Sequence, residues 1–302
     1  MSMVGEIFYW VLNMSVLGSA LGLVLLLLRR ISSLPRFFIY SLWSLPLLRL
    51  LLPVALPARY SLLSAFSRAK SVPMPLETGL TLSNFIQFAE EYFPIVYKNE
   101  ILEKVFTVAG MIWLVIALVL ILCSVVLYFL TKSALRDAVH IKENIYRSEK
   151  LLSPAVYGIF KPKIVLPPNI SEEDLSYILA HERLHIRRRD NLWRVIAVVT
   201  ACVHWFNPLA WVFLKCFFSD MELACDAGVL KGLSDEDKKK YASALLSCNS
   251  ERTYYASAFG GAKTRVRVEN ILSYKRMTAV SAVCFVVLFV IIAIAVMTNA
   301  GG

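Results

Sequence analysis

Two histidines four residues apart, His181 and His185, are the residues of this chain best suited to chemistry. On a helix, residues i and i+4 lie on one face, so both imidazoles can bind the same zinc ion. Glu182 completes a His-Glu-x-x-His pattern. In zinc peptidases with this spacing, the metal polarises the scissile carbonyl and the glutamate takes a proton from the attacking water. The pattern alone fits a structural pair of histidines equally well, so the surrounding sequence has to decide.

A catalytic zinc site needs a third protein ligand and keeps its fourth position open for water. The chain has only four histidines, and neither His140 nor His204 has a partner at ligand spacing. Glu222 and Asp226 lie one helical turn apart on one predicted helix face. We expect Glu222 to be the third ligand, and Asp226 to accept the N–H of a ligating imidazole and fix its tautomer. The alternative for this pair is a solvated acidic helix surface.

The elements that must position these residues can be predicted in part. Ser171, followed by three acidic residues, predicts the N-cap and first turn of a helix that runs through His181 toward Asp190. Short β-prone runs separated by prolines precede it, at residues 145–149, 155–160 and 163–166. They predict a small sheet. Its edge could receive an extended substrate by strand addition, or the strands could form a purely structural hairpin.

Residues 195–218 form an apolar run that is long enough to cross a membrane. Crossing would place His181 and Glu222 on opposite sides and would prevent a shared zinc site. Asn207-Pro208 interrupts the run in its middle, and Lys215 lies in its second half. We therefore expect a hairpin of two helices, with apolar faces that pack in the domain core or rest on the bilayer surface.

The composition places the chain in a membrane. Of 302 residues, 58% are hydrophobic and 18% are charged, and the mean hydropathy is +0.61, which is too apolar for an ordinary soluble domain. Four stretches are candidate transmembrane helices: residues 7–28, 37–56, 105–130 and 277–297. The net charge of +10 does not indicate nucleic-acid binding, because cytoplasmic loops of membrane proteins carry excess Lys and Arg.

Basic residues also predict the orientation. They follow the first and third stretches and precede the fourth, which makes these flanks cytoplasmic: Arg29, Arg30, Arg36, Lys132, Arg136, Arg265, Arg267, Lys275 and Arg276. Orientation alone accounts for Arg265 and Arg267. The predicted fold is a mainly α membrane protein with four transmembrane helices, both termini outside, and a cytoplasmic α+β zinc peptidase domain inserted between helices 3 and 4.

The predicted boundaries are a membrane region at 1–131, a cytoplasmic domain at 132–276, and the last helix with a short external tail at 277–302. The external loop, 57–104, contains an apolar and polar alternation at 80–97 that suits a short amphipathic helix on the membrane. In the cytoplasmic domain, three acidic residues after Ser234 predict a helix entry. Residues 250–263 could form a flexible strand that enters the peptidase cleft, or an ordinary loop. The six cysteines contain no Cys-x-x-Cys pair, so we expect free thiols rather than a thiolate zinc site.

These motifs resemble those of the BlaR/MecR-type membrane zinc peptidases over most of the chain. The resemblance rests on residues 153–167, 181–190, 204–208 and 222–226. It implies a gluzincin-like domain facing the cytoplasm, with His181, His185 and Glu222 as zinc ligands and Glu182 as the base. In the β-lactam-sensing members, the peptidase responds to an extracellular penicillin-binding domain and leads to cleavage of a DNA-binding repressor, with autocleavage on activation.

The sequence departs from this family pattern at three points. Five residues follow the fourth apolar stretch in the printed sequence, so we expect neither a C-terminal penicillin-binding sensor domain nor direct covalent sensing of β-lactams. Arg183 stands where the family usually has a smaller or apolar residue, and Cys225 stands where it often has alanine. Neither is expected to touch a proposed ligand.

The function predicted from these patterns is that of a membrane-anchored zinc endopeptidase in transmembrane signalling. Its expected cofactor is one zinc ion. Its expected partners are membrane lipid and a cytoplasmic protein substrate, a DNA-binding transcriptional repressor, without direct nucleic-acid contact. Autocleavage and a homodimer stay open. The alternatives are a signalling scaffold that keeps the fold but transmits without hydrolysis, and a membrane quality-control protease.

Overall fold

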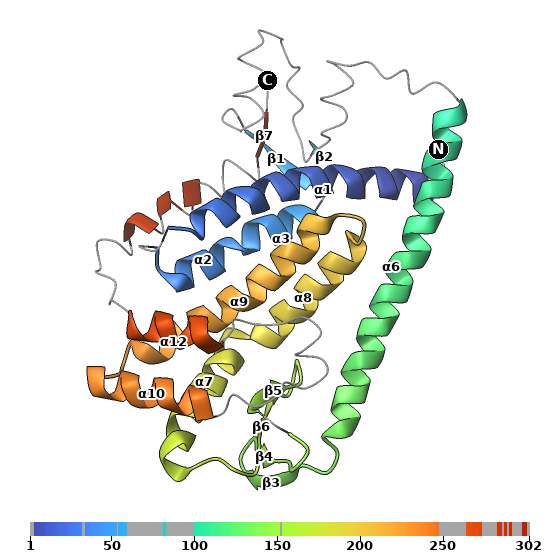
Figure 1. Cartoon of the computed structure of the whole chain (residues 1–302). Helices are drawn as coiled ribbons and strands as arrows, with labels where there is room; N and C mark the ends of the chain where they lie inside the picture. Colours follow the sequence, from blue (N-terminus) through green and yellow to red (C-terminus); the bar gives the residue numbers. More distant parts are fainter. Residues whose placement is uncertain are drawn as a thin grey trace.

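The computed structural model describes residues 3–31, 34–52, 54–58, 81–82, 100–151, 153–247, 264–273, 283–285, 287–288, 290–291 and 298–300. This part of the chain is mainly helical, with two small sheets (Figure 1). The helices are α1 (Met3–Leu28), α2 (Arg36–Leu42), α3 (Ser44–Leu51), α6 (Glu100–Ala134), α7 (Glu172–Arg188), α8 (Asp190–Val203), α9 (Pro208–Leu230), α10 (Asp235–Ser247) and α12 (Thr264–Leu272).

Two helices are long and apolar enough to cross a membrane. They are α1 over its whole length and the part of α6 from Lys104 to Ser133. Helix α1 contains the predicted first stretch, 7–28, and α6 contains the predicted third stretch, 105–130. Most of the apolar side chains along α6 are exposed, as expected of a helix that faces lipid. Membrane localisation is therefore supported by two helices within the described residues.

The second predicted stretch, 37–56, is not one helix. It consists of α2 and α3, separated at Trp43, followed by an extended Leu52 and the strand β1 (Val54–Ala58). Pro46, in the first turn of α3, has no amide hydrogen to bond to the Leu42 carbonyl, and the helix breaks one turn before it, at Trp43. The prediction of a single helix over 37–56 is wrong for this reason. The fourth stretch, 277–297, and the external loop, 57–104, lie largely outside the described residues.

The larger sheet precedes α7 and has the strand order β3-β4-β6-β5. Its strands are β3 (Val139–Lys142), β4 (Ile145–Arg147), β5 (Ala155–Tyr157) and β6 (Lys163–Leu166). The pair β4 and β6 is parallel, and the other two pairs are antiparallel. The predicted run 163–166 is confirmed as β6, whereas 155–160 is shortened because Gly158 adopts a left-handed φ of 95° and begins a turn. Strand β3 was not predicted.

A second sheet, with the order β2-β1-β7, joins segments that are far apart in sequence. Strand β2 (Thr81–Leu82) pairs antiparallel with β1, and β7 (Thr298–Ala300) pairs parallel with it. In Figure 1 this sheet lies above α1, whereas α7, α10, α12 and the four-stranded sheet lie on the opposite side of α1. The tail and the segment after α3, both predicted to be external, therefore lie next to each other.

Local sequence signals set the start and the end of α7, the helix that carries the two histidines. The Ser171 side chain caps α7 by accepting a hydrogen bond from the Asp174 amide at 3.1 Å, as predicted. The helix ends at Arg189, whose left-handed backbone (φ 55°, ψ 38°) turns the chain so that α8 starts at once with Asp190. This sharp turn brings the first residue of α8 back toward the end of α7.

The apolar run 195–218 folds back as a hairpin of α8 and α9, which confirms the prediction. Asn207 caps α9 through its side-chain oxygen, and Pro208 occupies the first helical position, where no amide hydrogen is needed. The Asn207 amide also donates to the hydroxyls of Ser15 and Ser19 on α1, at 2.8 and 2.7 Å. The hairpin therefore packs against α1 rather than only in the domain core or on a bilayer surface.

The main hydrophobic core lies between α2, α3 and the α8–α9 hairpin. Its most deeply buried members include Ile39, Trp43, Ala201, Phe217 and Met221. Helix α1 lies close to the same core, because Gly22 faces the Phe213 ring and a Cβ there would come within 2.1 Å of it. The elements predicted to lie in the membrane and the elements that carry the site thus share one core.

Two further helices follow α9 within the described residues. Helix α10 starts at Asp235 after Ser234, which confirms the predicted helix entry, and α12 precedes the last apolar stretch. The two helices pack through a small core that contains Leu230, Tyr241 and Ile271. The segment 250–263 lies outside the described residues.

Candidate metal centre

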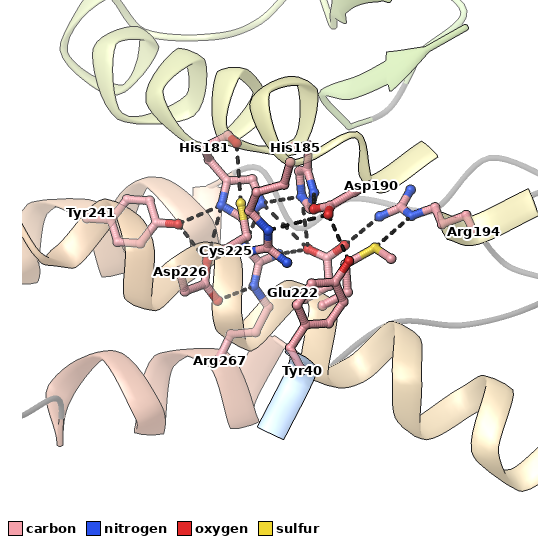
Figure 2. A network of polar contacts seen from close by, with 12 residues as sticks. Tyr40, His181, His185, Asp190, Arg194, Glu222, Cys225, Asp226, Tyr241 and Arg267 are labelled. Atoms are coloured by element: carbon pink, nitrogen blue, oxygen red, sulfur yellow. Dashed lines mark hydrogen bonds and ion pairs between the residues drawn. The ribbon is translucent and has the colours of Figure 1, made fainter. Parts of the chain in front are cut away.

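His181 and His185 lie on one face of α7, and each points its Nε2 atom at the other. The two Nε2 atoms are 3.1 Å apart, and both side chains are buried (Figure 2). Two imidazole nitrogens this close must share a proton or a metal ion, because two protonated rings would repel each other. Glu182, between them in sequence, is also buried.

Glu222 on α9 completes a group of three candidate ligand atoms. Its Oε2 atom lies 3.5 Å from His181 Nε2 and 3.8 Å from His185 Nε2. Three atoms bound tetrahedrally to one zinc ion at about 2.0–2.1 Å lie about 3.3–3.4 Å apart. The three observed separations are close to this value, so the residues present fit a zinc ion.

A further potential ligand, Cys225, comes from the same helix. One ligand atom from each of His181, His185 and Cys225 lies within 4.8 Å of the others. The thiol donates a hydrogen bond to the His181 carbonyl oxygen at 3.4 Å, so the expectation that Cys225 touches no proposed ligand is wrong. Burial raises the pKa of this thiol, but the adjacent histidines have the larger, opposite effect and bring the pKa to about 7. We favour Glu222 as the ligand because its carboxylate oxygen faces both Nε2 atoms, whereas the thiol bonds to the backbone.

Behind the ligand atoms, a carboxylate lies next to the Nδ1 atom of each histidine. Asp190 Oδ2 is 2.6 Å from His185 Nδ1, and Asp226 Oδ1 is 3.3 Å from His181 Nδ1. A carboxylate at Nδ1 holds a proton there and leaves the lone pair of Nε2 free for a metal. The structure thus places Asp226 where its predicted role requires. No role was predicted for Asp190, although its position five residues after His185 was a usable signal.

Tyr241 on α10 was not predicted as part of the site. Its hydroxyl donates to Asp226 Oδ1 at 2.6 Å and lies 2.9 Å from His181 Nδ1. Burial and the nearby Asp226 carboxylate raise the pKa of this phenol, despite the opposing effect of His181, so the hydroxyl keeps its proton. Tyr241 therefore links Asp226 to the imidazole of His181.

The chain is similar to known proteins of one family. The family model described as BlaR1 peptidase M56 matches residues 9–280. The chain belongs to the M56 peptidase family. It is similar to the regulatory protein BlaR1 of Bacillus licheniformis, with 35% identity over 114 residues, or 37% of this chain and 19% of the relative.

Two further relatives support the M56 assignment. The methicillin resistance mecR1 protein of Staphylococcus aureus is 30% identical over 106 residues, or 34% of this chain and 18% of the relative. The regulatory protein BlaR1 of Staphylococcus aureus is 22% identical over 233 residues, or 68% of this chain and 40% of the relative. The chain thus spans less than half the length of each of these relatives. Membership of M56 implies a metallopeptidase, and these regulatory relatives support a membrane-associated signalling role.

In this M56 chain, two arginines balance the negative charge around the three ligand atoms. Arg194 Nη2 lies 2.8 Å from Glu222 Oε1, and Arg267 Nη1 lies 3.4 Å from Glu222 Oε2. Burial would raise the pKa of the Glu222 carboxyl, but the two histidines and Arg267 hold it well below its ordinary value. Glu222 is therefore ionised, as a metal ligand must be.

Arg267 also forms a two-point pair with Asp226, with Nε–Oδ2 and Nη2–Oδ1 distances of 2.8 and 2.7 Å. Orientation in the membrane does not by itself explain this residue, because its guanidinium lies in the site. The sequence offered no signal for this contact, since 41 positions separate the two residues.

Proposed function

We propose that this chain is a membrane-anchored zinc endopeptidase in which His181, His185 and Glu222 hold the metal. The observation that carries the proposal is the triangle of Nε2, Nε2 and Oε2 atoms with sides of 3.1, 3.5 and 3.8 Å. It supports a two-histidine, one-glutamate site of the gluzincin type with one position open for chemistry. The M56 family match supports the same class of enzyme.

When bound, zinc would acidify a water molecule and polarise the carbonyl of a peptide bond. Glu182 is the general base in this proposal: it takes the proton of the water and passes it to the leaving amine. Glu182 follows His181 on α7 and is buried, so its carboxylate lies in a region of low dielectric, which supports this role. The Asp190 and Asp226 carboxylates lie beside the Nδ1 atoms and would keep the imidazole protons there, which would leave both Nε2 lone pairs for the metal.

The proposed substrate is a cytoplasmic protein, a DNA-binding transcriptional repressor. This proposal rests on the similarity to the regulatory proteins BlaR1 and mecR1, and on the basic residues that assign the site-bearing side to the cytoplasm. It includes four membrane crossings, the second of them made by α2 and α3 instead of one helix, the peptidase domain at 132–276, and both termini outside. Autocleavage within 251–263 is part of the same proposal.

Where a substrate would bind is constrained by the edge strand β5. Asn191 Nδ2 donates to the carbonyls of Val156 and Gly158, at 3.1 and 2.9 Å. These contacts fix β5 beside the start of α8. The carbonyl oxygens of Val156 and Gly158 are thus already occupied by the Asn191 amide. Addition of a substrate strand would therefore use other backbone groups of β5.

The experiment that tests the function compares the purified chain with its Glu182→Gln variant in detergent. Both are incubated with denatured, proteome-derived peptides, and mass spectrometry identifies new N-termini. We expect cleavage by the wild type, a loss of at least about 100-fold in the variant, and equal zinc content in both. Glu173→Gln, an exposed position on the same helix, is the matched control and should leave cleavage unchanged.

Equal signalling in cells by the Glu182→Gln variant and the wild type would favour the non-proteolytic scaffold. Cleavage of unfolded membrane proteins without preference for a repressor would favour the quality-control protease. Absence of zinc from the wild type would remove the enzymatic proposal altogether.

A further inference from the structure

Tyr40, on α2, contacts the residue that holds His185 in place. Its hydroxyl donates a hydrogen bond to Asp190 Oδ1 at 3.0 Å, although 150 positions separate the two residues. The other oxygen of the same carboxylate, Oδ2, lies 2.6 Å from His185 Nδ1. Asp190 has no exposed surface, so protein groups rather than water orient its carboxylate. Figure 2 shows Tyr40 reaching this group from below.

The Tyr40 ring is itself held in one position. It stacks on Phe217 of α9, with centroids 5.5 Å apart and an interplanar angle of 19°. The Arg188 guanidinium lies over the same ring at 4.3 Å, and its Nε atom is 3.4 Å from Asp190 Oδ1. Stacking and cation–π contacts of this kind restrict the ring, so the hydroxyl has a fixed direction.

We propose that Tyr40 is a positioning residue for His185, acting through Asp190, and that it couples α2 to the metal centre. This inference rests on the proposed function, because it takes His185 as a zinc ligand. A carboxylate behind a ligating imidazole sets its tautomer and ring orientation. A donor on the second oxygen of that carboxylate then fixes the carboxylate, and through it the direction of the His185 Nε2 lone pair.

The test uses the full chain in detergent and measures zinc affinity by competition with a chromophoric chelator. Tyr40→Phe keeps the ring and its stacking on Phe217, and removes only the hydroxyl. We expect zinc affinity to fall about 5- to 10-fold, less than the roughly 10- to 100-fold expected when Asp190 itself is replaced, because Tyr40 acts only through Asp190. Cobalt substituted for zinc should show altered visible absorption bands, since these report the geometry of the ligands.

Tyr177→Phe is the matched control. The Tyr177 hydroxyl also donates to a carboxylate, Asp237 Oδ1 at 3.1 Å, but this carboxylate contacts neither histidine. We expect its zinc affinity and cobalt spectrum to match those of the wild type. Equal losses in Tyr40→Phe and Tyr177→Phe would overturn the inference, because the effect would then be general.

If the single variants lose stability, the inference is tested by a double-mutant cycle that combines Tyr40→Phe with Asp190→Asn. Asp190→Asn should weaken zinc binding about 10- to 100-fold. In that background, Tyr40→Phe should have no further effect, because both changes break the same link. Additive losses would overturn the inference. If the wild type binds one zinc ion and Tyr40→Phe binds it equally tightly, the inference about Tyr40 is overturned and the proposed function still stands. Wild-type protein without zinc would overturn the proposed function itself.

Discussion

Arg29 and Asp220 form a two-point ion pair that joins the end of α1 to the helix carrying Glu222. The Nε–Oδ2 and Nη2–Oδ1 distances are 2.6 and 2.9 Å, and Trp43 Nε1 donates to the same carboxylate at 2.7 Å. Asp220 is fully buried and lies two residues before Glu222 on α9. A candidate membrane helix is thus connected directly to the helix that supplies a metal ligand.

Replacement of Arg29 by Met should lower the free energy of unfolding by about 3 kcal/mol, because it leaves the Asp220 charge buried without its main partner. Thermal unfolding in detergent, followed by circular dichroism, measures the change. Arg30→Met is the control at an exposed neighbouring position and should stay within about 0.5 kcal/mol of wild type. Equal stability of the two variants would show that the Arg29–Asp220 pair is dispensable.

Arg267→Met should also destabilise the chain by about 3 kcal/mol, since Asp226 has only 1% of its surface exposed and would lose both guanidinium contacts. Arg267→Lys should recover only part of this loss, because a single ammonium cannot reproduce the two-point geometry. The exposed Arg265→Met serves as control on the same helix. Full recovery by lysine would indicate that only the charge matters.

Replacement of Glu222 by Ala should weaken zinc binding by more than about 100-fold, because loss of a supporting residue alone costs 10- to 100-fold. Cys225→Ala should retain about one zinc ion per chain. Inductively coupled plasma mass spectrometry gives the stoichiometry. The cobalt-substituted wild type should lack an intense sulfur-to-cobalt charge-transfer band. Presence of that band, or loss of zinc from Cys225→Ala, would identify the thiol as a ligand in place of Glu222.

Zinc binding should release protons at pH 7. Burial lowers the pKa of His181 and His185, but Cys225 and the neighbouring side chains outweigh it, and both pKa values lie well above the ordinary value. The metal-free pair therefore holds a proton between its two Nε2 atoms that zinc must displace, so affinity should rise with pH and fall on acidification. Isothermal titration in two buffers with different ionisation enthalpies should show about one proton released per zinc ion. A binding enthalpy that does not depend on the buffer would contradict this.

The sequence determined the features that depend on local spacing. The N-cap at Ser171 and the i, i+4 spacing of His181 and His185 act within one helix, so α7 was predictable with its histidines on one face. Asn207-Pro208 stopped one helix and started the next because a capping side chain and a missing amide are local properties. Pro46 is a local signal of the same kind, because its missing amide interrupts helical hydrogen bonding in the second apolar stretch.

Only the tertiary structure decided which distant side chains surround the metal ligands. Tyr40, Tyr241 and Arg267 reach the site from three separate helices, and no periodicity within α2, α10 or α12 indicates their direction. Their contacts depend on how the helices pack, and packing is set by the whole core. The turn at Arg189 shows the limit most clearly, since one left-handed residue decides that Asp190 meets His185.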